Sequence, residues 1–224
     1  MFIASIVLVS CTSNVEPYAY AEELDGIGCL RLGDSYKDVK AALDSNYLNY
    51  RDVIRKNHGS INFVDINRNK MIYYKGPSPI ETPDKYNTDY KKYEATLIIS
   101  EELAVKEVEL YFWHDTLHKI SFLNRIGTDE VAEALIYKYG EGAGPKKKTG
   151  SRTEEVHIWG NDLCVATYVG NITYSLNSQG LASGVQSWFH RIDITLSEER
   201  MNNEITRYLE HADSLYQASK YNGI

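Results

Sequence analysis

Apolar and polar residues alternate with a period of two between residues 106 and 122. The apolar positions of the first half are Val108, Leu110 and Phe112, and a polar triplet at 114–116 then interrupts the pattern. Alternation of this kind is typical of a half-buried strand, because successive side chains of a strand point to opposite faces. The segment is therefore predicted to be a β-hairpin with its turn at 114–116.

The same pattern recurs towards the C-terminus. Residues 155–168 predict a second hairpin that turns at Gly160-Asn161-Asp162. Residues 169–176 can add a further strand, and residues 185–196 alternate again. The chain is therefore expected to contain a large proportion of paired strands.

Helical spacing is found in three other segments. Residues 36–47, 131–139 and 201–216 each place apolar side chains three or four positions apart. Gly140 directly follows the second segment, at a position where glycine commonly ends a helix. The proline-rich residues 76–93 have neither period and are predicted to form a long loop.

Two short matches indicate an internal repeat. Residues 39–43 (VKAAL) align with 131–135 (VAEAL), and 107–110 (EVEL) align with 155–158 (EVHI). Neither match is specific alone, but their shared order favours a tandem duplication. The sequence therefore predicts an α+β fold of two helix-plus-antiparallel-sheet units in tandem, followed by a C-terminal helix. The predicted segments are a signal peptide (1–10), a lipid-anchored tether (11–25), a first unit (26–124) with the inserted loop 76–93, a second unit (125–196) and the C-terminal helix (197–224).

The N-terminus indicates where the protein is located. The apolar run from Phe2 to Val9 is too short to span a bilayer as a helix, which takes about 20 residues, and it fits the apolar region of an export signal. Leu8-Val9-Ser10-Cys11 resembles the lipobox of bacterial lipoproteins. That resemblance implies cleavage before Cys11 and lipidation of its thiol. No Lys or Arg precedes the run, and a buried first strand is the alternative.

Two further observations bear on location and partners. Residue 12 is Thr and not Asp, which by analogy with enteric bacteria favours the outer membrane. The expected location is the bacterial cell envelope, as an outer-membrane lipoprotein that faces the periplasm. The formal net charge of −7 argues against a nucleic-acid partner, because phosphate binding depends on clustered Lys and Arg.

The first predicted helix carries a family resemblance. Residues 32–43 (LGDSYKDVKAAL) resemble the "Gly, small polar, Val-x-x-x-Leu" helix of small envelope lipoproteins, which include the smallest lipoprotein of the outer-membrane β-barrel assembly machinery. Tyr139-Gly140 to Pro145 is similar to the end of that helix, and the β-lactamase inhibitor protein has two such units in tandem. The resemblance implies a fold that acts by binding another protein of the envelope, with no catalytic residue and no cofactor.

A carbohydrate- or small-ligand-binding lipoprotein is the main alternative. Tryptophan and tyrosine suit such sites because each ring has an apolar face and a polar tip. The chain contains 18 Tyr and three Trp. The candidate ligand-binding residues are Trp113, Trp159 and Trp188.

A metal-dependent hydrolase is a more distant alternative. His114 and His118 have a spacing that places two imidazoles on one face of a helix, but they span a predicted turn. His157 and His190 lie in other predicted strands. Scattered strand histidines are the more common case, so no metal site and no catalytic residue are predicted.

The two cysteines that follow Cys11 allow two interpretations. An oxidising periplasm permits a disulfide between Cys29 and Cys164. Their apolar neighbours fit two buried thiols equally well.

Overall fold

The computed structural model describes residues 18–46, 72–73, 89–100, 103–124, 127–179 and 181–221. The helices are a segment over residues 36–46, α2 (Thr128–Tyr139) and α3 (Glu199–Tyr221). The strands are β1 (Ala19–Tyr20), β2 (Gly26–Ile27), β3 (Leu30–Arg31), β4 (Ile72–Tyr73), β5 (Tyr90–Ile98), β6 (Ala104–Trp113), β7 (Thr116–Leu123), β8 (Lys146–Thr149), β9 (Arg152–Gly160), β10 (Cys164–Leu176) and β11 (Ala182–Leu196).

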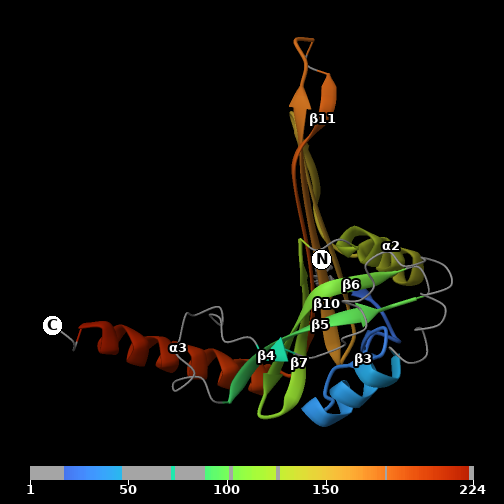
Figure 1. Ribbon diagram of the computed structural model, residues 1–224. Coiled ribbons are helices and arrows are strands. Elements are labelled where there is room, and N and C mark those ends of the chain that lie inside the picture. Colours follow the sequence, from blue (N-terminus) through green and yellow to red (C-terminus); the bar gives the residue numbers. More distant parts are fainter. Residues whose placement is uncertain are drawn as a thin grey trace, which may run out of the picture.

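Within these residues, nine strands form one mixed sheet in the order β1-β9-β10-β11-β7-β6-β5-β4, with β8 also paired to β9 (Figure 1). Among the described strands, only β1 and β9 run parallel, and β2 pairs with β3 separately. The strands β5–β7 and β9–β11 make two meanders. These meanders are joined where β11 pairs with β7, with Ile192 opposite Phe122 and Ile194 opposite Ile120.

The prediction of two helix-plus-antiparallel-sheet units in tandem is wrong. Both meanders belong to one sheet, and both predicted helices pack into one hydrophobic core. Val39 and Leu43 of the first helix share a cluster with Val131 and Leu135 of α2. The physical reason is that separate units would leave the outer edges of β7 and β11 exposed, and pairing these edges satisfies their backbone groups.

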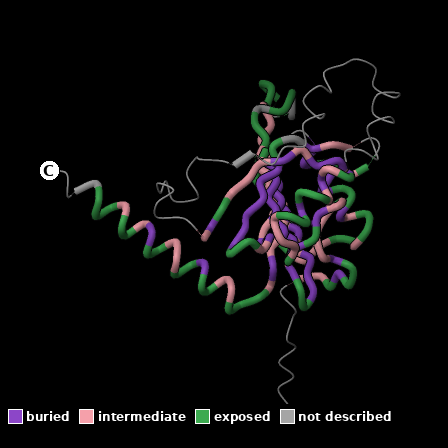
Figure 2. Tube along the Cα trace, turned by 60° about the horizontal axis from the view of Figure 1, so that its bottom comes forward, coloured by how far each residue is buried: buried purple, intermediate pink, exposed green. Residues whose placement is uncertain are grey.

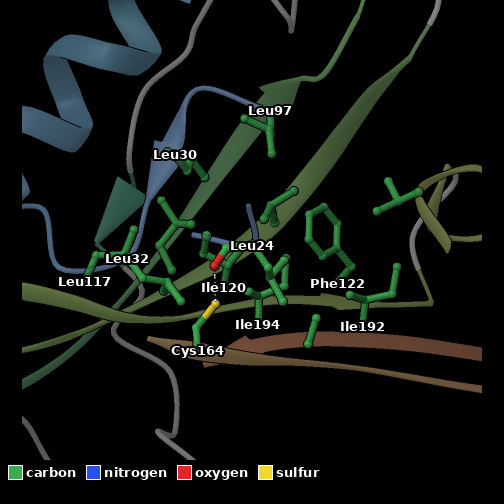
Figure 3. Close-up of a cluster of buried hydrophobic side chains, with 14 of the residues drawn as sticks. Leu24, Leu30, Leu32, Leu97, Leu117, Ile120, Phe122, Cys164, Ile192 and Ile194 are labelled. Carbon is green, nitrogen blue, oxygen red and sulfur yellow. Dashed lines mark hydrogen bonds between the residues drawn. The ribbon is translucent and has the colours of Figure 1, made fainter. Parts of the chain in front are cut away.

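The main core lies on one face of the sheet, beneath α2 and the helix over 36–46. Figure 3 shows Phe122, Ile192 and Ile194 gathered with Leu24 and Leu30 of the N-terminal segment. All five side chains are at most 1% exposed. Each such side chain contributes about 1.5–3 kcal/mol by leaving water, so the joined meanders form one folding unit.

Both predicted hairpins are confirmed. β6 and β7 are joined at His114 and Asp115, whose φ angles of 45° and 75° suit a two-residue turn of the kind that matches strand twist. β9 and β10 are joined by Asn161, Asp162 and Leu163. α2 ends at Gly140 as predicted, with φ at 78°.

Other predictions fall at or beyond the limits of the described residues. β5 begins at Tyr90, so the last four residues of the predicted loop 76–93 form a strand. Residues 76–88 of that loop lie outside the described residues, as do the signal peptide and Cys11.

The opposite face of the sheet carries polar side chains such as Lys92 and Glu109 together with aromatic ones, and the first half of α3 covers part of it. Ile205 of α3 packs with Tyr90, Tyr111 and Trp113 in a smaller buried cluster. Past this cluster α3 extends away from the body of the molecule (Figure 1, red). Across the described ranges, no helix has an apolar stretch of the length that a bilayer crossing requires.

Candidate functional site

A long two-stranded ribbon projects from the sheet (Figure 1). β10 has 13 residues and β11 has 15. β7 pairs with β11 only between Arg191 and Thr195, and β9 accompanies β10 only as far as Thr173. We call residues 171–189, which lie beyond the last row shared with β7, the arm.

The arm has one apolar face that continues the core face of the sheet. On β10, the alternate residues from Ile172 to Leu176 share this face. On β11, Trp188 lies opposite Ile172 and Val185 lies opposite Tyr174. The preceding alternate positions of β10 are buried in the body. The apolar face of the arm therefore continues the row of residues that is buried in the body.

The side chains of this apolar face become solvent-exposed along the arm. Trp188 is 49% exposed, Leu176 is 50% exposed, Val185 is 57% exposed, and Leu181 at the tip is 61% exposed. Figure 2 shows the change from buried to exposed residues between the body and the projecting ribbon. Contiguous exposed apolar side chains on a soluble protein commonly mark a contact surface, so the arm is the candidate functional site.

The free edge of β11 is irregular. The pairing of the two strands skips Gln186, and it skips Ser183 a few residues later. Each extra residue is a β-bulge, which bends the strand and breaks the regular spacing of its N–H and C=O groups. Proteins use bulges to keep exposed edges from pairing with other strands. The arm therefore offers its apolar face for contact, and not its edge.

The arm also lies in a stretch without charge. The 27 residues from Leu163 to Phe189 contain no Asp, Glu, Lys, Arg or His, although 25% of the chain is Asp, Glu, Lys or Arg. Exposed strands commonly carry Lys or another charge that discourages association. This segment has none. The absence of charge is visible in the sequence, but it was not used to predict this site.

A polar cluster lies at the base of the arm. Glu155, Gly170 and His190 are side by side in the register of β9, β10 and β11. The hydroxyl of Tyr168 lies over Gly170, 2.8 Å from Nδ1 of His190 and 3.5 Å from Oε1 of Glu155. Burial, followed by the charge of Glu155, raises the pKa of Tyr168, so this hydroxyl stays protonated.

His157 extends this cluster towards the end of α2. Its ring is buried and stacks on Trp159, with the ring centroids 5.6 Å apart. Its Nδ1 is 3.3 Å from Oε2 of Glu141, and its Nε2 is 3.8 Å from Oε2 of Glu155. These contacts connect β9, β10, β11 and the residues after α2, so the cluster can hold the base of the arm in place.

The three candidate tryptophans do not share a surface. Trp159 is fully buried and donates its Nε1–H to the carbonyl oxygen of Gly140 at 2.8 Å. Trp113 belongs to the cluster beneath α3, with its ring centroid 5.0 Å from that of Tyr208. Trp188 is the exposed member and lies on the arm.

The candidate histidines are divided between the two faces of the sheet. His157 and His190 lie on the core face with Tyr168. His118 lies against Tyr90 on the other face, with the ring centroids 5.4 Å apart, and His114 is exposed in the turn. In the part of the chain that the structure describes, no three His, Cys, Asp or Glu side chains are arranged to hold a metal ion.

Cys29 and Cys164 are free thiols and not a disulfide. Cys164 is buried, and its Sγ–H donates to the carbonyl oxygen of Leu24 at 3.1 Å (Figure 3). Burial, followed by the charge of Asp25, raises the pKa of the Cys164 thiol to about 12. Burial also raises the pKa of Cys29. Both thiols are therefore protonated near neutral pH and poorly nucleophilic.

A pocket of about 220 Å³ lies between α2 and the β2–β3 hairpin, with Val131 in its wall. Its charged side chains are paired with one another: Lys138 lies 3.2 Å from Glu23, and Arg31 lies 3.0 Å from Asp25. Pockets that bind drug-sized ligands are usually about 300–1,000 Å³ and present unpaired polar groups. This pocket is therefore a weaker candidate site than the arm.

Comparison of the chain with protein-family models, curated proteins and solved structures finds no match.

Proposed function

We propose that this chain is a lipid-anchored, non-enzymatic protein of the bacterial cell envelope that binds a protein partner through the apolar face of the arm. The observation that carries the proposal is the uncharged arm, on which four large apolar side chains are each about half exposed. Such a face gains binding free energy at roughly 25 cal/mol per Å² of apolar area removed from water. A protein with an apolar surface of its own is the partner that provides this burial.

The position of the N-terminal segment supports a contact away from the anchor. β1 pairs with the end of β9 at Trp159 and Gly160, and Gly160 lies opposite Val165 near the start of β10. The strand from Val165 to Leu176 is about 35 Å long at ~3.3 Å per residue. The described residues therefore begin near the end of β10 that is opposite the tip of the arm.

The two alternative functions have less support. A carbohydrate platform needs aromatic rings that face one ligand, whereas Trp113, Trp159 and Trp188 lie in three separate places. A metal-dependent hydrolase needs converging ligands, and His118 lies on the opposite face of the sheet from His157 and His190.

Photo-crosslinking in intact cells tests the proposed contact. A photoreactive amino acid at Leu181 places the reactive group at the tip of the arm. The matched control is the same amino acid at Tyr137, which is 95% exposed on α2. We expect a discrete protein adduct from position 181 and none from position 137. The proposal is wrong if neither position gives an adduct or if both give the same one.

Replacement of Cys11 by Ala tests the anchor separately. We expect the variant to move from the membrane fraction to the soluble fraction while its unfolding midpoint stays unchanged, because only the lipid is lost. Cys29→Ala is the control and should stay in the membrane fraction. A Cys11→Ala variant that remains with the membrane would contradict the anchor.

A further inference from the structure

We infer that the partner on the arm is a second copy of this chain, whose own arm packs against it face to face and antiparallel about a two-fold axis. This inference rests on the proposed function, in which the arm is the contact element, and it names the partner. Three features of the arm lead to it: its lack of charge, its single apolar face and the amount of surface that this face offers.

The distribution of charge favours contact between arms. Each chain carries a formal net charge of −7, so two copies repel one another. The arm itself has no charge, and Arg152 and Glu154 of β9 flank only its first rows, at Thr173 and Asn171. Its tip lies about 20 Å beyond the last row shared with β7 at ~3.3 Å per residue. This length exceeds the Debye length of roughly 8 Å at physiological ionic strength. Antiparallel arms thus keep the two acidic bodies at opposite ends of the dimer, where their repulsion is screened.

The lack of charge also favours a second copy of this chain, over a foreign protein, as the partner. Contact surfaces that select a foreign partner commonly carry charges that steer it and exclude others. The segment from Leu163 to Phe189 has no charge with which to do so. A neutral face is instead what allows two copies of one acidic chain to meet.

The shape of the arm suits a self-complementary contact. Its exposed apolar strand side chains, Trp188, Val185 and Leu176, share one face, and the other face carries Asn171, Thr173 and Ser187, with the half-buried Phe189 at its base. A two-fold axis uses the same patch on both copies, so one apolar face per chain is sufficient. With the axis at the row of Tyr174 and Val185, Val185 of each copy lies at the centre of the contact. The bulges at Ser183 and Gln186 disfavour the alternative, edge-to-edge pairing of the β11 strands.

The exposed area predicts a weak dimer. Half-exposed apolar side chains of this size each present on the order of 100 Å². Three of them, Trp188, Val185 and Leu176, on each of two copies give roughly 600 Å², below the about 1,200–2,000 Å² of stable complexes. The dimer should therefore form reversibly and depend on protein concentration.

Disulfide trapping tests which face of the arm is in contact. Val185→Cys places a thiol on the apolar face, and Ser187→Cys places one on the opposite face; both positions are exposed. Under a mild oxidant, we expect the full-length Val185→Cys variant to form a disulfide-linked species of twice the chain mass. The Ser187→Cys variant and the unmodified chain should give no disulfide-linked species. Equal trapping at positions 185 and 187, or no trapping at position 185, would overturn the inference.

Sedimentation equilibrium of the full chain provides the second test. The unmodified chain and Ser187→Glu should dimerise with rising concentration, whereas Trp188→Glu should weaken the dimer at least tenfold. A chain that stays monomeric throughout the concentration series would overturn the inference.

The photo-crosslink at position 181 distinguishes this inference from the proposed function. An adduct of twice the chain mass supports both. An adduct with a different protein alone leaves the proposed function standing and overturns the second copy as the partner. Absence of any adduct overturns both.

Discussion

The hydroxyl of Tyr168 lies 2.8 Å from Nδ1 of His190, above the glycine that separates β9 from β11 in that row of the sheet. Tyr168 is two rows closer to the body than Gly170, so its side chain leans along β10 to reach the histidine. This contact joins β10 to β11 at the position where β7 stops pairing and the arm begins. The base of the arm therefore depends on a small residue at position 170.

Gly170→Ala should destabilise the protein by about 1–3 kcal/mol, the usual cost of overpacking a well-filled site. A Cβ at Gly170 would lie 2.5 Å from the Tyr168 hydroxyl and 3.1 Å from Cγ of Glu155, so the tyrosine must move. Urea unfolding measures the change. Gly184→Ala on the arm is the control, because no atom of the described residues lies within 4 Å of its Cβ position. An equal loss of stability in the two variants would show that the base of the arm does not depend on a small residue at position 170.

Local pattern was sufficient to predict the hairpins but not how the two meanders join. The turn at His114 and Asp115 follows from a polar break between two alternating segments. By contrast, Ile120 pairs with Ile194 across a large separation in the chain. Alternation shows that both side chains face a core, but it does not select a neighbouring strand, because any apolar face can cover another. The joining of both meanders into a single sheet could therefore not be predicted from the alternation of apolar and polar residues.

The arm was only partly predictable for a related reason. Residues 169–176 and 185–196 were expected to be strands, yet their pairing into one projecting ribbon depends on where β7 and β9 end. The contact between Tyr168 and His190 likewise exists only because of the register between β10 and β11. The charge-free run from Leu163 to Phe189 was the available clue, since few exposed segments lack charge over such a length.

Asn161→Ala should cost about 2–4 kcal/mol, because it leaves several buried backbone groups without a partner. The Asn161 Nδ2 donates to the carbonyl oxygens of Ala21 and Leu24 at 2.8 and 2.7 Å. Its Oδ1 accepts from the backbone N–H groups of Leu163 and Cys164 at 2.8 and 3.0 Å. The side chain thus holds the N-terminal segment against the β9–β10 turn, and thermal or urea unfolding should detect its loss.

Asn171→Ala is the matched control for that change. Asn171 accepts one exposed hydrogen bond, from Nε of Arg152 at 3.0 Å. Surface changes of this kind usually alter stability by less than about 0.5 kcal/mol. A comparable loss in both variants would show that Asn161 does not hold the N-terminal segment.

His118 should make stability depend on pH between about 6.5 and 4. Burial, followed by the charge of Lys119, lowers the pKa of His118 to about 4, whereas an unfolded histidine titrates near ~6.5. As the pH falls below 6.5, the unfolded chain binds a proton that the folded chain does not. Stability is therefore lost on acidification, by about 2 kcal/mol at pH 5.

His118→Leu should remove this part of the pH dependence. Within the described residues, neither ring nitrogen of His118 has a hydrogen-bond partner, so an apolar side chain leaves no group unpaired. Urea unfolding at neutral pH and at pH 5 measures the difference between the variant and the unmodified chain. His211→Leu on the exposed surface of α3 is the control. If His118→Leu keeps the full loss of stability at pH 5, the histidine is not its source.

Shortening the arm should weaken self-association without changing the stability of the fold. Replacement of residues 175–184 by Asn-Gly would connect Tyr174 to Val185, which are paired across the ribbon, through a two-residue turn. This dipeptide suits such a hairpin turn. Among the described residues, the two buried clusters contain none from 169 to 191. The free energy of unfolding should therefore change by less than about 1 kcal/mol. Self-association should fall at least tenfold, because Leu176 and Leu181 are removed.

Two outcomes would contradict this prediction. A shortened chain that loses several kcal/mol of stability would show that the arm supports the fold. A shortened chain that still dimerises would show that the contact lies elsewhere.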